Sequence, residues 1–199
     1  MKTALAAAAN AALFGALAVA VLADGAVVRF DVAANAFLAA WRVPWLVQAC
    51  LWLTNFGSGA ALGGVAMTAT AFLYAAQRGV FILPLWATIL CAQVTVWVSK
   101  LTIGRVRPEF LPGVASVNLP AFPSGHTTGA MATFGFLAYV LTRDLPSGRA
   151  RLAVIAASAL LIALVGFSRV LLRVHFATDV LGGLFLGAFW LCVGVALAK

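Results

Sequence analysis

Long apolar segments follow one another along almost the whole chain, and this pattern restricts the possible folds more than any other feature. A helix that crosses a bilayer needs about 20 mostly apolar residues. In this chain of 199 residues, 64% are hydrophobic and 9% are charged. A water-soluble domain is about 25% charged, so folding in water would leave large apolar surfaces exposed. We therefore expect an integral membrane protein.

The chain has room for six such segments, which predicts an all-α membrane protein with six transmembrane helices and a single domain over residues 1–199. The expected helices cover about 3–23, 45–76, 80–100, 124–142, 150–167 and 174–198. The first segment follows Lys2 and could instead be a signal peptide, but its length and the even number of spans favour a retained helix. We expect a break in the second near Gly57-Ser58-Gly59.

The segment 24–44 differs from its neighbours because it mixes charged and aromatic residues. We predict an amphipathic segment that lies in the membrane interface and carries Phe30, Phe37 and Trp41. Residues 101–123 contain four prolines and form the longest stretch unsuited to a membrane. This stretch should connect the third and fourth helices outside the hydrocarbon.

The net charge of +8 could indicate nucleic-acid binding in a soluble protein. Here the charges are scattered between apolar segments, so membrane orientation and anion binding explain them better, and no nucleic-acid partner is expected. Cys50, Cys91 and Cys192 all lie in apolar stretches, and their spacing fits neither a metal site nor a disulfide framework.

Basic residues in short loops favour the cytoplasmic side of a membrane. The side that holds the two termini carries six of them: Lys2, Arg78, Arg143, Arg149, Arg151 and Lys199. The opposite side, apart from three residues assigned to a site below, carries four: Arg29, Arg42, Arg105 and Arg173. We therefore expect both termini in the cytoplasm. We also expect the membrane to be the plasma membrane of a bacterial cell.

The polar residues suited to chemistry form three short clusters. The chain has only two histidines, one in Pro123-Ser124-Gly125-His126 and one in the segment 168–179. A third cluster, residues 100–108, contains a lysine and two arginines. In the predicted topology all three lie at helix ends on one side of the membrane, facing away from the cytoplasm. Ionisable residues near a bilayer are costly and indicate a functional site.

His175 and Asp179 are four residues apart, so they would be neighbours on the predicted sixth helix. The carboxylate can accept the Nδ1 proton of the imidazole, which leaves the lone pair of the other nitrogen free to attack. An ordinary ion pair on a helix surface explains the same spacing.

Ser124 and Gly125 predict the start of a helix. Ser124 would be the N-cap, and Gly125 would allow a ligand to approach the backbone. Free amides at such a terminus attract an anion, although a structural cap beside an incidental His126 remains the alternative. Lys100, Arg107 and Arg169 are suited to phosphate oxygens.

Arg105 and Arg173 are expected instead to extend toward lipid headgroups. No acidic residue close in sequence is available to pair with the three site cations except Glu109.

Taken together, the clusters resemble the three-part signature of the type 2 phosphatidic acid phosphatase family. Lys100 is followed after six residues by Arg107-Pro108, and Pro123-Ser124-Gly125-His126 comes next. Ser168-Arg169 then precedes His175 by five residues, with Asp179 three residues further on. Every defining position is present and in order.

The resemblance implies a role for each position. His175 would be the nucleophile, Asp179 its orienting partner, and His126 the general acid and then the general base. The phosphate-binding groups would be Lys100, Arg107, Ser124, Gly125 and Arg169. It also implies a membrane lipid phosphate as the substrate, a phosphohistidine intermediate, and neither a metal nor another cofactor.

Some neighbouring residues depart from the commonest bacterial form, namely Leu172-Arg173 before the histidine and Phe176-Ala177-Thr178 after it. They leave the substrate open among phosphatidic acid, phosphatidylglycerol phosphate and undecaprenyl diphosphate. A lipid phosphotransferase would use the same residues, and an anionic-lipid transporter would need only the cations. The related vanadium-dependent peroxidases are soluble, which the composition disfavours.

The predicted orientation can be tested by cysteine labelling in a background without the three native cysteines. A cysteine at Ser116 should react with an impermeant thiol reagent in intact cells, because residues 101–123 should lie outside the cytoplasm. A cysteine at Ser147 should react only after permeabilisation, and the reverse pattern would refute the topology.

Overall fold

The computed structural model describes residues 1–108, 111 and 119–199, and within them every regular element is a helix. In chain order they are α1 (Lys2–Leu22), α2 (Ala26–Ala39), α3 (Pro44–Thr54), η1 (Asn55–Gly57), α4 (Gly59–Ala75), η2 (Gly79–Phe81), α5 (Ile82–Ile103), α6 (Gly125–Arg143), α7 (Gly148–Leu171) and α8 (Ala177–Leu197). The prediction of an all-α fold is confirmed for these residues.

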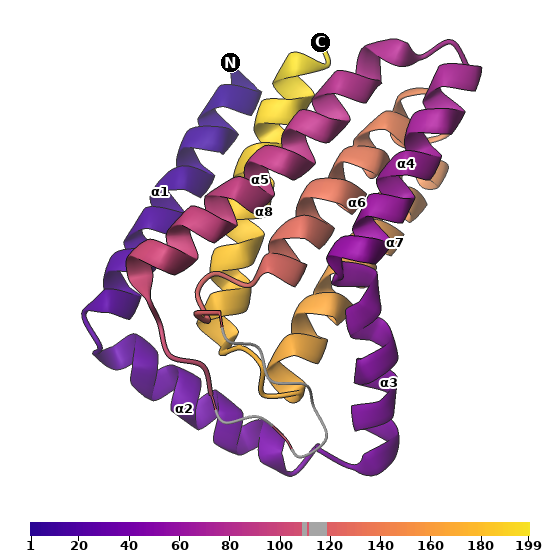
Figure 1. Cartoon of the computed structure of the whole chain (residues 1–199). Coiled ribbons are helices and arrows are strands. Elements are labelled where there is room, and N and C mark those ends of the chain that lie inside the picture. The colour runs from indigo at the N-terminus through magenta and orange to yellow at the C-terminus, as the bar shows by residue number, and fades with distance from the viewer. Residues whose placement is uncertain (109–110, 112–118) are drawn as a thin grey trace.

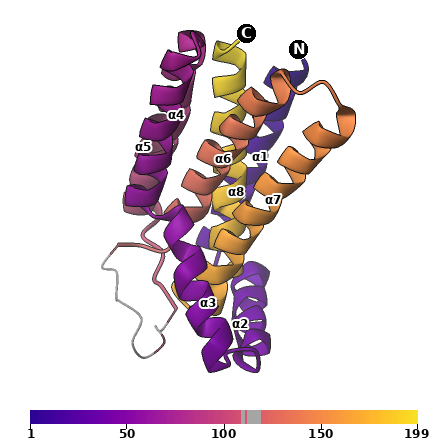
Figure 2. The ribbon, with the colours of Figure 1, turned by 90° about the vertical axis from the view of Figure 1, so that its right-hand side faces the viewer.

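The helix α6 occupies the centre of the bundle and contacts α5, α7 and α8, while α1 packs on α8 and α3 on α7 (Figures 1 and 2). A close approach between α8 and the start of α6 requires a glycine at position 183. A Cβ atom added there would lie 2.7 Å from the carbonyl oxygen of Ser124, well inside van der Waals contact. This glycine therefore lets α8 lie directly against the segment that carries His126.

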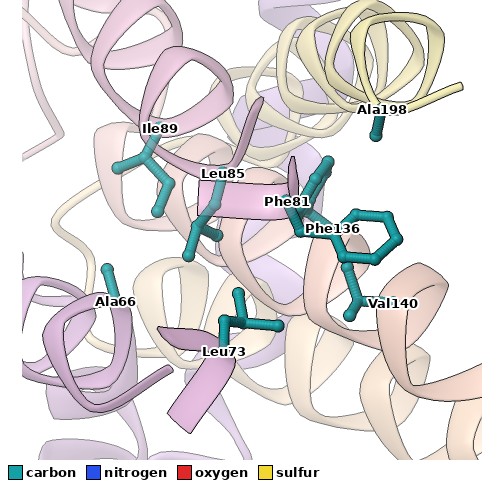
Figure 3. Packing of buried hydrophobic residues seen from close by; sticks show 8 residues of the cluster. All are labelled: Ala66, Leu73, Phe81, Leu85, Ile89, Phe136, Val140 and Ala198. Carbon is teal, nitrogen blue, oxygen red and sulfur yellow. The ribbon is translucent and has the colours of Figure 1, made fainter. Parts of the chain in front are cut away.

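The largest buried apolar cluster joins α4, η2, α5, α6 and the end of α8 (Figure 3). Its members are Ala66, Leu73, Phe81, Leu85, Ile89, Phe136, Val140 and Ala198. The cluster includes residues of the turn between α4 and α5 and of the C-terminal end of α8, and both lie at the end of the bundle that carries the two termini (Figure 1). The opposite end is therefore available for polar groups.

Four helical segments are long and apolar enough to cross a membrane: Lys2–Leu22, Gly79–Ile103, Gly148–Leu171 and Ala177–Leu197. The pair Pro44–Gly57 and Gly59–Ala75, bent by 49°, makes a fifth if it is counted as one span. The bend confirms the predicted break. The predicted number of six is not confirmed, because α6, with four threonines, a histidine and an arginine among its 19 residues, is not among these segments.

The sixth helix was predicted to begin at about residue 174, and this boundary is wrong. The preceding helix α7 continues to Leu171, and Arg173 then adopts a left-handed backbone conformation with φ of 55°. Because this conformation cannot continue a right-handed helix, the chain turns and α8 starts only at Ala177. His175 therefore lies in the α7–α8 connection and not on a helix.

The helices α2 and α3 lie at the end of the bundle opposite the termini, together with the α7–α8 connection and with residues 104–108 and 119–124, which flank α5 and α6 (Figures 1 and 2). As expected for an interfacial segment, α2 and the residues after it expose Phe30, Phe37 and Trp41. Ser116 lies outside the described residues, and Ser147 is the N-cap of α7. The side of the membrane that each end faces stays a prediction.

Candidate active site

A cavity of about 400 Å³ lies among the predicted site residues. Six of the eight line it: Lys100, Arg107, Gly125, His126, Arg169 and His175. The other two, Ser124 and Asp179, are fully buried. The structure thus brings both histidines and three cations to one space from the last turn of α5, the following connection, the start of α6, the end of α7 and the α7–α8 connection.

His175 is 2% exposed and is held between an acidic and a basic group. Its Nδ1 atom lies 3.3 Å from Oδ2 of Asp179, and its Nε2 atom lies 3.4 Å from a terminal nitrogen of Arg107. With the proton on Nδ1, the imidazole donates to Asp179 and Nε2 carries the lone pair.

Burial lowers the pKa of His175 to about 3. The hydrogen bond to Asp179 opposes this shift, and the positive charges of Arg107 and Arg169 add to it. The ring is therefore neutral at physiological pH, which is the state that can act as a nucleophile.

Asp179 reaches His175 by a geometry different from the predicted pairing on a helix surface. It stands in the first turn of α8, where its Oδ2 atom accepts a hydrogen bond of 2.8 Å from the amide of Phe176. A carboxylate is favoured there because helix N-termini carry partial positive charge. The start of α8 therefore fixes the carboxylate, and the imidazole approaches from the preceding connection.

The two histidine clusters are joined by a backbone hydrogen bond of 2.9 Å, in which the amide of Ser124 donates to the carbonyl oxygen of Asp179. Ser124 occupies the predicted N-cap position of α6, but its hydroxyl makes no capping bond and instead accepts one from the hydroxyl of Thr127, at 3.1 Å. Its side chain does not line the cavity, whereas the neighbouring Gly125 and His126 do.

The cations of the cavity also bond to nearby backbone carbonyls. The Nζ atom of Lys100 donates to the oxygens of Pro120 and Ala121. Arg107 donates through Nε to Leu119 and through one terminal nitrogen to Val174, both at 2.6 Å. These bonds hold the charges in place before any anion binds, and burial lowers the pKa of Arg107 from its usual value.

The bend between α3 and α4 contributes to the site, which the sequence reasoning missed. A terminal nitrogen of Arg169 donates to the hydroxyl of Thr54 at 2.6 Å, and the Nε atom has no hydrogen-bond partner among the described residues. Gly57 packs on His126, since an added Cβ atom would lie 3.0 Å from the Cβ of that histidine. The helix break predicted at Gly57-Ser58-Gly59 was the sequence feature that could have indicated this contribution to the site.

The expectation that Arg105 extends toward lipid headgroups is wrong. Its side chain is only 8% exposed and forms ion pairs with Oδ2 of Asp31 at 2.6 Å and with Oδ1 of Asp179 at 2.5 Å. Asp31, also buried, was missed as well. Both carboxylates lie 74 residues from Arg105 in the sequence, so no local pattern relates them.

The depressed pKa of His175 can be tested by ¹⁵N-histidine NMR on a His126→Asn variant, in which His175 is the remaining histidine. The ring should stay neutral from about pH 8 to 5, whereas an ordinary histidine takes up a proton near 6.5. The unfolded chain would bind this proton near 6.5 and the folded chain only near 3. His175 should therefore lower stability as the pH falls below 6.5. A ring that titrates near 6.5 in the folded protein contradicts the burial argument.

Two relatives are similar to this chain over most of its length. Phosphatidylglycerophosphatase B of Bacillus subtilis strain 168 is 34% identical over 153 residues, which are 73% of this chain and 72% of that protein. A lipid A 1-phosphatase of Rhizobium johnstonii is 29% identical over 166 residues, which are 78% of this chain and 63% of that protein.

Two solved structures have a similar fold. One, described as the first transmembrane PAP2 type phosphatidylglycerolphosphate phosphatase from Bacillus subtilis, has a TM-score of 0.88 and 30% identity, covering 96% of this chain and 94% of that chain. LpxE of Aquifex aeolicus has a TM-score of 0.60 and 24% identity, covering 81% and 92%, and supports the fold alone. The model of the PAP2 superfamily matches residues 81–199. This chain, with its apolar helices and its lipid phosphatase relatives, belongs to the PAP2 superfamily.

Proposed function

We propose that this protein hydrolyses phosphate monoesters or diphosphates of membrane lipids, with His175 as the nucleophile. The observation that carries the proposal is the position of the His175 ring. Its Nδ1 atom lies beside Asp179, its Nε2 atom lies beside Arg107, and the ring lines a cavity shared with three cations. This arrangement supplies an oriented neutral imidazole and a site for a phosphoryl group.

In the first step, Nε2 of His175 attacks phosphorus and forms a P–N bond while the P–O bond to the lipid breaks. His126, which lines the same cavity, gives a proton to the departing oxygen. In the second step, His126 takes a proton from water, whose oxygen attacks phosphorus, and the P–N bond breaks to release inorganic phosphate. Proton transfers of this kind are worth about 10²–10⁴-fold in rate.

The phosphoryl oxygens would be bound by Lys100, Arg107, Arg169 and the backbone of Gly125, all of which line the cavity. The amides at the start of α6 have no partners within the helix and favour an anion. Ser124, whose side chain does not line the cavity and whose amide donates to Asp179, would contribute indirectly by fixing the start of α6. Transfer of a phosphoryl group depends mainly on positioning and on neutralising the charge of these oxygens.

We further propose that the chain is one membrane domain in which α6, surrounded by other helices, also crosses the membrane and brings the number of spans to six. The site would face away from the cytoplasm in a bacterial plasma membrane.

Trp97, 58% exposed on the outer surface of α5, also borders the cavity, so a lipid could present its headgroup from the side. Phosphatidylglycerol phosphate is the first candidate substrate, because the Bacillus subtilis relative and the similar Bacillus subtilis structure are both named for the removal of phosphate from that lipid.

The proposed reaction uses no metal ion. Asp31 and Asp179 both form ion pairs with Arg105. Few carboxylate oxygens near the cavity are therefore left to bind Mg²⁺, which prefers such ligands. Among residues 1–108, 111 and 119–199 no three histidine, cysteine or acidic side chains gather in a way that could hold a metal.

A phosphate-release screen tests the proposed function directly. Purified protein in detergent, with excess EDTA, should release phosphate from at least one of phosphatidylglycerol phosphate, phosphatidic acid and undecaprenyl diphosphate. The His175→Ala variant should lose this activity, and Arg149→Ala, which removes an exposed charge from the first turn of α7, should retain it.

The outcomes of this screen separate the parts of the proposal. Absence of phosphate release from all three lipids contradicts hydrolysis of this class. Release that requires Mg²⁺ contradicts the metal-free mechanism. Normal turnover by His175→Ala contradicts the choice of nucleophile.

The role of His126 can be tested with two leaving groups. An activated aryl phosphate needs little protonation on departure, so a His126→Ala variant should release the phenol in a burst and then stall as an acid-labile phosphohistidine. With a lipid monoester the same variant should be slow in the first step, by about 10²–10⁴-fold, and should accumulate little intermediate. Equal slowing of both substrates without trapped phosphohistidine would make His126 a binding or structural residue.

A further inference from the structure

A buried ion-pair network lies beside Asp179. One terminal nitrogen of Arg105 donates to Oδ1 of Asp179 at 2.5 Å and to the hydroxyl of Thr178 at 2.8 Å. The other terminal nitrogen donates to Oδ2 of Asp31 at 2.6 Å. The guanidinium also lies over the ring of Phe176, 4.5 Å from its centroid. Arg105 is thus bound on several sides, and it spans two carboxylates with its planar fork.

This network sets the orientation of the Asp179 carboxylate. The group is planar, so a bond that fixes one oxygen also fixes the other. Arg105 holds Oδ1, while Oδ2 accepts from the amide of Phe176 at 2.8 Å and faces Nδ1 of His175 at 3.3 Å. Without Arg105, only the contacts that Oδ2 makes with Phe176 and His175 would restrict rotation of the carboxylate.

Asp31 anchors Arg105 from a different part of the chain. It belongs to α2, and its carboxylate accepts hydrogen bonds from the amide of Thr178 at 3.0 Å and from the hydroxyl of the same residue. Asp31 is 1% exposed, and a buried carboxylate is stable only when it is paired. The pairing with Arg105 and Thr178 therefore ties α2 to the first turn of α8.

Arg105 does not itself line the cavity in which His126 and His175 lie, although Arg107, two residues later, does. A phosphoryl group in this cavity would touch Arg107 and not Arg105. Any effect of Arg105 on the reaction must then pass through Asp179. This distinguishes it from the cations proposed above to bind phosphate.

We propose that Arg105 is a positioning residue for His175, acting through the Asp179 carboxylate, and that Asp31 of α2 is the second anchor that holds Arg105 in place. The inference rests on the proposed function, because it takes His175 as the nucleophile. It adds to the machinery two residues that are not defining positions of the signature, and it makes the geometry of the nucleophile depend on the helix α2.

The first test compares Arg105→Gln with Arg29→Gln, which removes an exposed arginine from α2. Losing a partner that orients a reactive group typically costs about 10–100-fold in activity. Arg105→Gln should lower kcat and the rate of phosphohistidine formation from an aryl phosphate by roughly this factor. KM and the inhibition constant of vanadate should change less than about threefold, because the phosphate-binding groups remain. Arg29→Gln should match the wild type in all four quantities.

A double-mutant cycle asks whether Arg105 acts through Asp179. In an Asp179→Asn background, Arg105→Gln should reduce phosphohistidine formation by less than about threefold, since the group that it orients is already altered. An equal loss in both backgrounds would give Arg105 a general structural role. An increase in KM with unchanged kcat would make it a phosphate ligand. Either result overturns the proposal.

Arg105→Lys covers the case in which Arg105→Gln does not fold. Lysine keeps the positive charge between Asp31 and Asp179 but lacks the fork that fixes both. This variant should elute and melt as the wild type does and still show a reduced kcat. Full activity would contradict positioning by the guanidinium.

The second anchor is tested by Asp31→Asn, with Asp24→Asn as the control at an exposed acidic residue. Asp31→Asn should lower kcat by less than Arg105→Gln does, and Asp24→Asn should have no effect. If the wild type is active and Asp31→Asn equals it, α2 is not an anchor and the proposed function stands. If the wild type releases no phosphate, the proposed function and this inference both fail.

Discussion

The arrangement of the site depends on the contacts of Asp179. Its backbone oxygen accepts from the amide of Ser124 at the start of α6, and its carboxylate accepts from the amide of Phe176 at the start of α8. The same carboxylate faces His175 and pairs with Arg105. Because one residue contacts the starts of α6 and α8, the imidazole of His175 and the side chain of Arg105, it joins the three signature segments at a single point.

The cluster of cations around the cavity should lower stability, because like charges repel and buried charges lose hydration. The structure balances this in two ways. Lys100 and Arg107 donate to carbonyls of residues 119–121 and to Val174, and Arg105 is neutralised by two carboxylates. The cations are thus held in place by the protein itself, and an anion bound among them would reduce the repulsion that remains.

Much of the fold follows from the sequence because apolar length and turn residues act locally. The break at Gly57 and the exposed aromatic residues after Ala26 were predicted on that basis. The start of α8 was misplaced because Arg173 takes a left-handed conformation that its residue type does not indicate. The gathering of cations and histidines was expected from the predicted topology and from the signature. The pairing of Arg105 with Asp31, by contrast, joins distant segments through a tertiary contact that no periodicity encodes.

The bend that connects α3 to α4 has an evolutionary consequence. The family match begins at residue 81, yet Thr54 bonds to Arg169 and Gly57 packs on His126. The first 80 residues therefore supply part of the wall against which the signature side chains rest. A substitution in this portion of the chain can therefore shift Arg169 or His126 while every residue of the signature is inherited unchanged.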